Sequence, residues 1–139
     1  MTNAPVLEHR HPRTVLFSHR LAAGNPAWLD QIDHELRSTG LACGQAPSGP
    51  ETILQVERGG LAAAVVVEDG QWFGGLTLLR IIRSVDLKLP CWLIARDATR
   101  RTLETAFSLG VSSVMATPLD VAILARSLKR TLSESAQQS

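Results

Sequence analysis

The chain has 139 residues, of which 45% are hydrophobic and 19% are charged, and its formal net charge is +1. This length and hydrophobic content fit one domain with a single core that needs neither disulfides nor metal. The balanced charge argues against a protein that binds nucleic acid over much of its surface. Because no secretory signal pattern and no apolar run of membrane-spanning length is present, we expect a soluble cytoplasmic protein.

The cysteines and histidines show no pattern typical of a metal site. Cys43 and Cys91 each lie in an apolar stretch, so we expect buried free thiols, which suit a reducing cytoplasm. His9 and His11 fall in a polar segment and form no spaced set with the cysteines. The sequence therefore predicts neither a metal site nor a cofactor.

The first third of the chain predicts two strands around one helix. Residues 1–12 are small and polar, contain two prolines and lack any period, so we expect a disordered N-terminal arm. The apolar, β-branched residues 13–18 predict the first strand. A helical pattern opens at Pro26 and is ended by Gly40, and residues 41–46 predict a second strand.

The middle of the chain carries the strongest strand signal. Residues 51–58 predict a short helix, which follows a turn and is ended by a Gly-Gly pair. Residues 61–67 (LAAAVVV) are continuously apolar rather than alternating, which is typical of a strand covered on both faces. A flexible glycine-rich loop over residues 70–75 is then predicted before a helix over residues 76–84.

The last third predicts two more strands, each followed by a helix. Residues 91–95 predict a fourth buried strand, and residues 99–109 predict a helix that a glycine ends. Residues 111–116 predict the fifth strand. Residues 119–132 predict an amphipathic helix with a leucine stripe, and the polar residues 133–139 predict a frayed tail.

Five strands therefore alternate with five helices in one domain over residues 13–132. This alternation is typical of a parallel sheet covered on both faces. We predict an α/β fold with a doubly wound five-stranded parallel sheet, a (βα)5 arrangement of the flavodoxin-like type. Such sheets bind ligands beyond the carboxyl ends of their strands, so any chemistry should lie just after residues 17, 67, 95 and 116.

Three segments of the chain resemble the receiver domains of bacterial two-component response regulators. Residues 65–83 resemble the family's third strand, acceptor loop and third helix. Residues 89–94 resemble the start of its fourth strand. Residues 106–119 resemble the family stretch Ala-x-x-x-Gly-Ala-x-x-Tyr-x-x-Lys-Pro. In their order and spacing the segments extend the resemblance over about residues 13–132, which implies the receiver fold.

The resemblance implies a particular phosphorylation chemistry. In the family, an aspartate at the end of the third strand takes a phosphoryl group from a histidine kinase. Two acidic residues after the first strand help to hold Mg²⁺, a hard cation that prefers oxygen ligands. The metal and a lysine after the fifth strand neutralise the charge of the transferred group, and a threonine or serine after the fourth strand contacts it.

The metal-binding and nucleophile positions of the family fall on unsuitable residues in this chain. The acidic pair falls on Ser18 and His19, neither of which is a carboxylate. His19 is expected to be a surface residue rather than a metal ligand or phosphoacceptor. The nucleophile position falls on Val67 or, because residues 65–67 fit the strand interior, on Glu68. Glutamate carries its carboxylate one methylene further out than aspartate and is not the family's acceptor.

The remaining family positions are changed as well, apart from one proline. The threonine or serine position falls on Ala95, the lysine position on Thr117 and the aromatic switch position on Val114. Pro118 is retained, and the resemblance implies a cis peptide bond before it. Phosphoryl transfer would lack its metal acids, its cation and its usual nucleophile together, so we expect a degenerate receiver that is not phosphorylated efficiently.

Three of these positions have alternative interpretations. Glu68 could mimic a phosphorylated aspartate, or it could be a capping carboxylate at a loop start. Asp69 could be a displaced phosphoacceptor, although the Asp-Gly pair is typical of a turn. Thr117 is expected to be the N-cap of the last helix, with Pro118 at the first helical position and Asp120 at the third.

Basic residues gather in the region that forms the family's usual output face. They lie in the loop after strand four and in the last two helices, and they suit either an acidic partner or a solvated helix surface. The candidate partner-binding residues, with the aromatic switch position, are Arg96, Arg100, Arg101, Val114, Arg126, Lys129 and Arg130.

We therefore expect a non-enzymatic, phosphorylation-independent interaction module in bacterial signalling. It would present strand five and the last two helices to a protein partner or a second copy, rather than to nucleic acid or a membrane. One alternative is a divergent receiver that is phosphorylated on Asp69 or Glu68. Another is a small ligand-binding protein or enzyme on a flavodoxin-like fold. The second alternative is disfavoured because the chain has no Gly-x-Gly-x-x-Gly motif after the first strand and no phosphate-loop lysine.

Overall fold

The computed structural model describes residues 13–18, 27–68, 74–96 and 98–138, and the side chains of the last range up to Ser133. Within these residues five strands alternate with five helices, as predicted. The strands are β1 (Arg13–Ser18), β2 (Leu41–Ala46), β3 (Leu61–Glu68), β4 (Cys91–Ala95) and β5 (Ser113–Ala116). The helices are α2 (Ala27–Arg37), α3 (Gly49–Arg58), α4 (Gly74–Val85), α5 (Arg100–Ser108) and α6 (Val121–Gln138).

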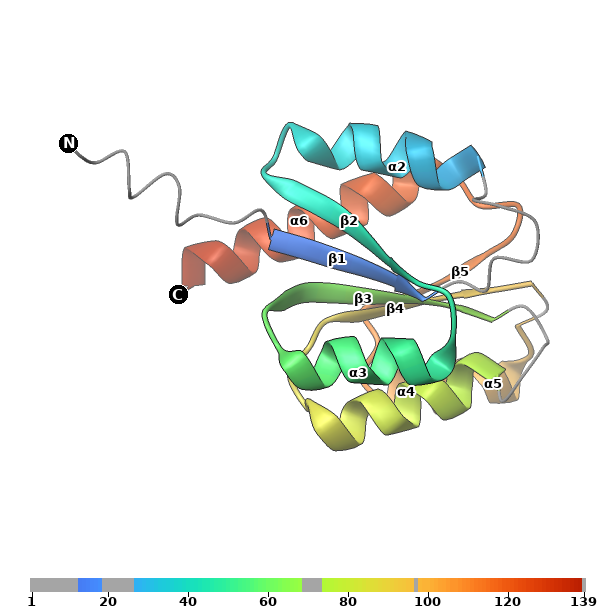
Figure 1. Cartoon of the computed structure of the whole chain (residues 1–139). Helices are drawn as coiled ribbons and strands as arrows, with labels where there is room; N and C mark the ends of the chain where they lie inside the picture. Colours follow the sequence, from blue (N-terminus) through green and yellow to red (C-terminus); the bar gives the residue numbers. More distant parts are fainter. Residues whose placement is uncertain (1–12, 19–26, 69–73, 97, 139) are drawn as a thin grey trace.

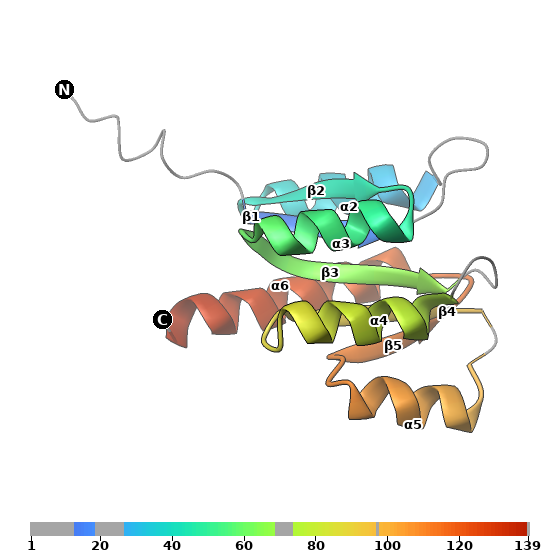
Figure 2. The same ribbon diagram turned by 60° about the horizontal axis from the view of Figure 1, so that its bottom comes forward.

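The strands form one parallel sheet in the order β2-β1-β3-β4-β5. Figure 1 shows α2 and α6 on one face of this sheet and α3, α4 and α5 on the other. The predicted doubly wound five-stranded parallel sheet is therefore confirmed. β5 is an edge strand of the sheet, and Figure 2 shows it between α5 and α6.

The two faces of β3 point into two separate hydrophobic cores. Ala63 and Val65 pack with α2 and α6, whereas Ala64 and Val66 pack with α3, α4 and α5. All four side chains are fully buried. Because successive strand side chains point to opposite faces, this arrangement explains why residues 61–67 are apolar throughout.

Trp92 lies in the core between β4 and α6 and is fully buried. Its indole Nε1 donates a 2.9 Å hydrogen bond to Ser127 Oγ on α6. This bond links β4 to the helix that covers it, and it satisfies a buried indole N–H that would be costly to leave without an acceptor.

Helices α3 and α4 each begin two residues earlier than predicted. Ser48 caps α3 by accepting a 3.2 Å hydrogen bond from Glu51 N, so the helix includes Gly49. α4 begins at Gly74, and the prediction that Gly74 and Gly75 belong to a flexible loop was wrong. In both cases a polar side chain outside the apolar pattern stabilises the first turn, and hydrophobic periodicity does not report it.

The ends of α6 also differ from the prediction. Thr117 is not its N-cap: Asp120 takes that place, because its Oδ1 accepts a 3.1 Å hydrogen bond from Ile123 N. The predicted end at residue 132 was too early, since the helix continues to Gln138 through residues that include the helix formers Glu, Ala and Gln. No described helix, α6 included, combines the length and hydropathy needed to cross a membrane.

The predicted start of β5 was too early by two residues. The N–H groups of Leu109, Gly110 and Val111 hydrogen-bond to carbonyls of α5, and Gly110 adopts a left-handed φ of 78°. These bonds close the end of the helix, so pairing with β4 starts only at Ser113.

Both cysteines are free thiols, as predicted, but only one is fully buried. Burial raises the pKa of the Cys91 thiol to about 11. Cys43 is half-buried, and burial together with the nearby Asp33 carboxylate raises its pKa to about 12. Both side chains are therefore protonated and unreactive at neutral pH.

Candidate functional site

Because the strands are parallel, the carboxyl ends of β1, β3, β4 and β5 lie at the same end of the sheet. Ser18 of β1 pairs with Val66 of β3. Glu68 of β3 pairs with Ala95 of β4, which in turn pairs with Ala116 of β5. This edge is where an α/β sheet of this kind binds its ligands, so its chemistry depends on the side chains that these strand ends carry.

The end of β1 carries a neutral hydroxyl group that is bound to α3. Ser18 is 8% exposed, and its Oγ forms a 2.9 Å hydrogen bond with Thr52 Oγ1. Thr52 Oγ1 also lies 2.8 Å from the Ser48 carbonyl oxygen. No local pattern could predict this contact, because its two residues meet only through tertiary packing. His19, the neighbouring predicted position, lies outside the described residues.

The end of β3 carries a half-buried carboxylate that is bound to α4. Glu68 Oε1 accepts a hydrogen bond from Gly75 N in the first turn of that helix. A carboxylate at this place satisfies an N–H group that has no partner within the helix, and it lies at the positive end of the helix dipole. This geometry agrees with the interpretation of Glu68 as a capping group. Asp69 lies outside the described residues.

The last residue of β4, Ala95, and the residue after β5, Thr117, are both uncharged. Ala95 is buried and has no polar side-chain atom. Thr117 is exposed directly after β5, and its peptide bond to Pro118 is cis, as predicted. Thr117, the residue directly after β5, therefore presents an uncharged hydroxyl group.

The described strand ends do not fit a Mg²⁺ site. Mg²⁺ is held in proteins through carboxylate oxygens and water. Of Ser18, Glu68, Ala95 and Thr117, only Glu68 carries a carboxylate, and one of its oxygens accepts the bond from Gly75 N. In the part of the chain that the structure describes, no group of three His, Cys, Asp or Glu side chains could hold a metal ion.

The predicted output residues lie directly after β4, on β5 and on the helices α5 and α6. α5 and α6 flank this strand on opposite faces of the sheet. Arg100 of α5 forms an exposed 3.1 Å ion pair with Glu104. Lys129 of α6 forms a 3.6 Å ion pair with Glu35 of α2 and is therefore directed toward that helix. The other predicted residues comprise the half-buried Val114 and four exposed arginines, Arg96, Arg101, Arg126 and Arg130.

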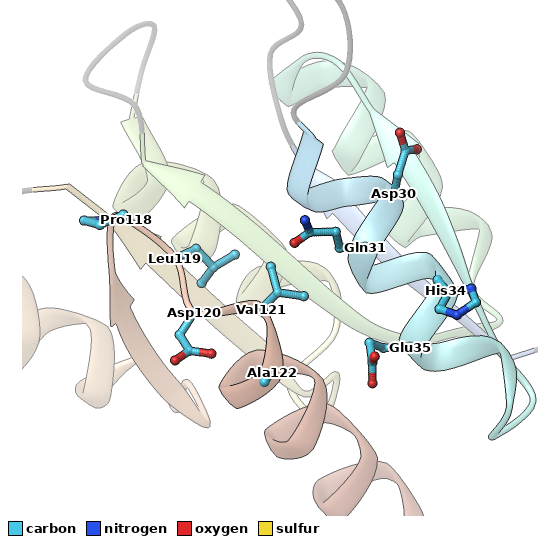
Figure 3. Close-up of a pocket in the computed structure, with 9 residues that line it drawn as sticks. All are labelled: Asp30, Gln31, His34, Glu35, Pro118, Leu119, Asp120, Val121 and Ala122. Carbon is cyan, nitrogen blue, oxygen red and sulfur yellow. The ribbon is translucent and has the colours of Figure 1, made fainter.

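A groove of about 910 Å³ lies between α2 and the start of α6, and the sequence did not predict it. Figure 3 shows Gln31 and Val121 facing each other across it. Its rim carries carboxylates with partners of their own: Asp120 caps α6, and Glu35 pairs with Lys129. Segments far apart in the sequence form this groove, so no motif marks it, and its acidic side chains do not converge on one point.

Comparison with known proteins identifies the fold. No family model and no curated protein matches the sequence. A CheY-like response regulator receiver domain protein from Methanospirillum hungatei matches with a TM-score of 0.77 at 16% identity, over 91% of this chain and 98% of that chain. A response regulator receiver protein from Pseudomonas putida matches with a TM-score of 0.72 at 20% identity, over 85% and 96% of the two chains.

The receiver domain of a sensor histidine kinase from Pseudomonas aeruginosa also matches, with a TM-score of 0.68 at 22% identity, over 87% of this chain and 98% of that chain. Its structure holds a magnesium ion in the active-site cleft, whereas the described residues of the present chain do not fit such a site. The chain has the fold of response regulator receiver domains.

Proposed function

We propose that this chain is a receiver-like signalling domain of the cytoplasm that binds a protein partner without being phosphorylated and without catalysing a reaction. The observation that carries the proposal is the hydrogen bond from Gly75 N to the Glu68 carboxylate. The Glu68 carboxylate stabilises a helix end, and among the described residues Ser18, Ala95 and Ala116, which end the neighbouring strands β1, β4 and β5, are uncharged.

Phosphoryl transfer at this edge would receive little electrostatic help. Ser18, Ala95 and Thr117 are uncharged, and none can replace a metal-binding acid or a lysine. Removing one positioned donor from an active site commonly costs about 3–4 kcal/mol of transition-state stabilisation. Because several such groups are absent together, we expect negligible transfer to Glu68.

Exposed residues on the two helices beside β5 support the proposal of a protein-binding face. Helix α5 carries the exposed Phe107 and helix α6 the exposed Ile123, which are 54% and 50% accessible. Arg100 and Arg126 are exposed on the same two helices. Interfaces commonly combine aromatic and apolar anchors with arginine. We therefore propose an acidic protein surface as the partner, with a second copy of this chain as the alternative.

Charge reversal on the two helices tests this proposal. The double variant Arg100→Glu with Arg126→Glu changes the face around β5. The matched control, Arg58→Glu with Arg80→Glu, reverses exposed arginines on α3 and α4. Each reversal should change stability by under about 0.5 kcal/mol, so circular dichroism should show all variants folded.

The readout is quantitative capture of proteins from an extract of the source organism, with sedimentation of the purified chain to detect self-association. We expect the wild type and the control to enrich the same partner, and the β5-face variant to lose it. Equal capture by all three proteins would remove this face from the proposal.

A further inference from the structure

Glu68 connects the end of β3 to the beginning of α4. Its Oε1 accepts the hydrogen bond from Gly75 N, in the first turn of the helix. α4 has no acidic residue in its own first turn, so the carboxylate that stabilises its N-terminus comes from the preceding strand. Negative charge at this position is favoured by both the unpaired N–H groups and the helix dipole.

The first two residues of α4 leave space for that carboxylate. A Cβ atom on Gly75 would lie 3.2 Å from Glu68 Oε1 and 3.1 Å from Leu93 Cδ1. A Cβ atom on Gly74 would lie 3.1 Å from the same oxygen, and Gly74 also adopts a left-handed φ of 76°. Larger residues would press against the carboxylate, so the glycine pair and Glu68 fit each other.

The other end of α4 is fixed by Arg83. Its guanidinium donates hydrogen bonds to the carbonyl oxygens of Leu109 at 2.6 Å, Leu89 at 2.7 Å, Asp86 at 3.1 Å and Gly110 at 3.2 Å. Leu109 and Gly110 connect α5 to β5. A contiguous chain of contacts therefore runs from Glu68 through α4 and Arg83 to the connection between α5 and β5, two of the three elements of the proposed partner face.

We propose that Glu68 is an internal anion that holds α4 on the end of β3 at all times and thereby fixes the α5–β5 junction through Arg83. The chain itself supplies this charge, through a side chain that accepts a hydrogen bond from the first turn of α4. The inference rests on the proposed function and deepens it, because it gives the domain one constitutive state at this edge.

Amide hydrogen exchange of the full chain, measured by NMR, tests the inference. Glu68→Ala removes the acceptor and the charge, and Glu68→Gln keeps an acceptor oxygen without the charge. Glu57→Ala, at an exposed position on α3, is the matched control. We expect Gly75 N–H to exchange about tenfold faster in Glu68→Ala, the size of effect that loss of a helix cap produces. Glu68→Gln should fall between Glu68→Ala and the wild type, and Glu57→Ala should match the wild type.

Two further readouts separate an anion from an ordinary structural contact. Sodium formate, compared with sodium chloride at equal ionic strength, should slow Gly75 exchange in Glu68→Ala and leave the wild type unchanged. The amide shifts of Leu109 and Gly110 should move in Glu68→Ala and return with formate, because the contacts through Arg83 couple the two ends of α4.

Three results would overturn the role of the charge. They are a wild-type exchange rate of Gly75 N–H in Glu68→Ala, a wild-type rate in Glu68→Gln, and an unchanged rate in Glu68→Ala when formate is added. Unmoved Leu109 and Gly110 shifts would overturn the coupling. None of these measurements uses a phosphodonor, so their failure is distinct from a failure of the proposed function, which would appear as phosphorylation of the wild-type chain.

Discussion

Gly75→Ala is expected to destabilise the domain even though alanine favours helices. The new Cβ would lie 3.1 Å from Leu93 Cδ1 and 3.2 Å from both Glu68 Cβ and Glu68 Oε1. Carbon atoms pack best at about 3.5–4.0 Å, so three neighbours must each move by a few tenths of an ångström. Crowding of a packed site costs about 1–3 kcal/mol. The helix preference of alanine over glycine returns up to about 1 kcal/mol. We therefore expect a net loss of about 1–2 kcal/mol.

Urea unfolding followed by circular dichroism measures this loss, and a double-mutant cycle with Glu68→Ala locates its origin. In the Glu68→Ala background one of the three crowded atoms is absent, so Gly75→Ala should cost at least about 0.5 kcal/mol less than it does in the wild type. A Gly75→Ala variant as stable as the wild type would refute the reasoning. Equal costs in both backgrounds would show that the carboxylate does not occupy this space.

Three further predictions concern the helix contacts and the thiols. Ser127→Ala removes the acceptor of the buried Trp92 N–H and should cost about 1–3 kcal/mol in urea unfolding, whereas Ser127→Thr should retain most of the stability. Asp120→Ala removes the cap of α6 and should cost about 1 kcal/mol, while Asp120→Asn should cost much less; thermal melts of both variants check this. The Cys43 and Cys91 thiols keep their protons in the folded chain after the unfolded chain has begun to lose them. Their contribution to the free energy of unfolding is therefore constant well below pH 9.0 and falls as the pH rises through 9.0 toward about 11 for Cys91 and about 12 for Cys43. Melts of the wild type and a Cys43→Ala, Cys91→Ala variant check this, and parallel pH profiles would contradict it.

The strands were the most predictable part of this fold. The bounds of β1, β2 and β4 agree with the sequence prediction. Each follows a proline or a glycine, and β1 and β4 are short, mainly apolar runs. Val65 and Val66 show why a doubly covered strand such as β3 is apolar without alternation. Strand pattern and connection length together were enough to predict the parallel sheet.

The contacts at the candidate site could not be predicted in the same way. The bond between Ser18 and Thr52 joins residues that meet only in the folded chain. Thr117 has the sequence context of an N-cap, yet Asp120 performs that role, because the turn after β5 delays the start of the helix. Gly74 and Gly75 indicate a loop by composition, whereas they form the first turn of α4, in which Gly75 N donates to the Glu68 carboxylate. In each case a hydrogen bond from or to a polar side chain stabilises the local structure, and hydrophobic periodicity cannot predict that bond.

We expect that the strand-end residues of this chain do not support phosphorylation. The most direct test is to incubate the full chain with acetyl phosphate and Mg²⁺ and to measure its intact mass, beside a phosphorylatable receiver as positive control. We predict an unchanged mass for this chain when the control gains a phosphoryl group. A gain of one phosphoryl group that is lost in Glu68→Ala or in Asp69→Ala would contradict the claim and would identify the acceptor.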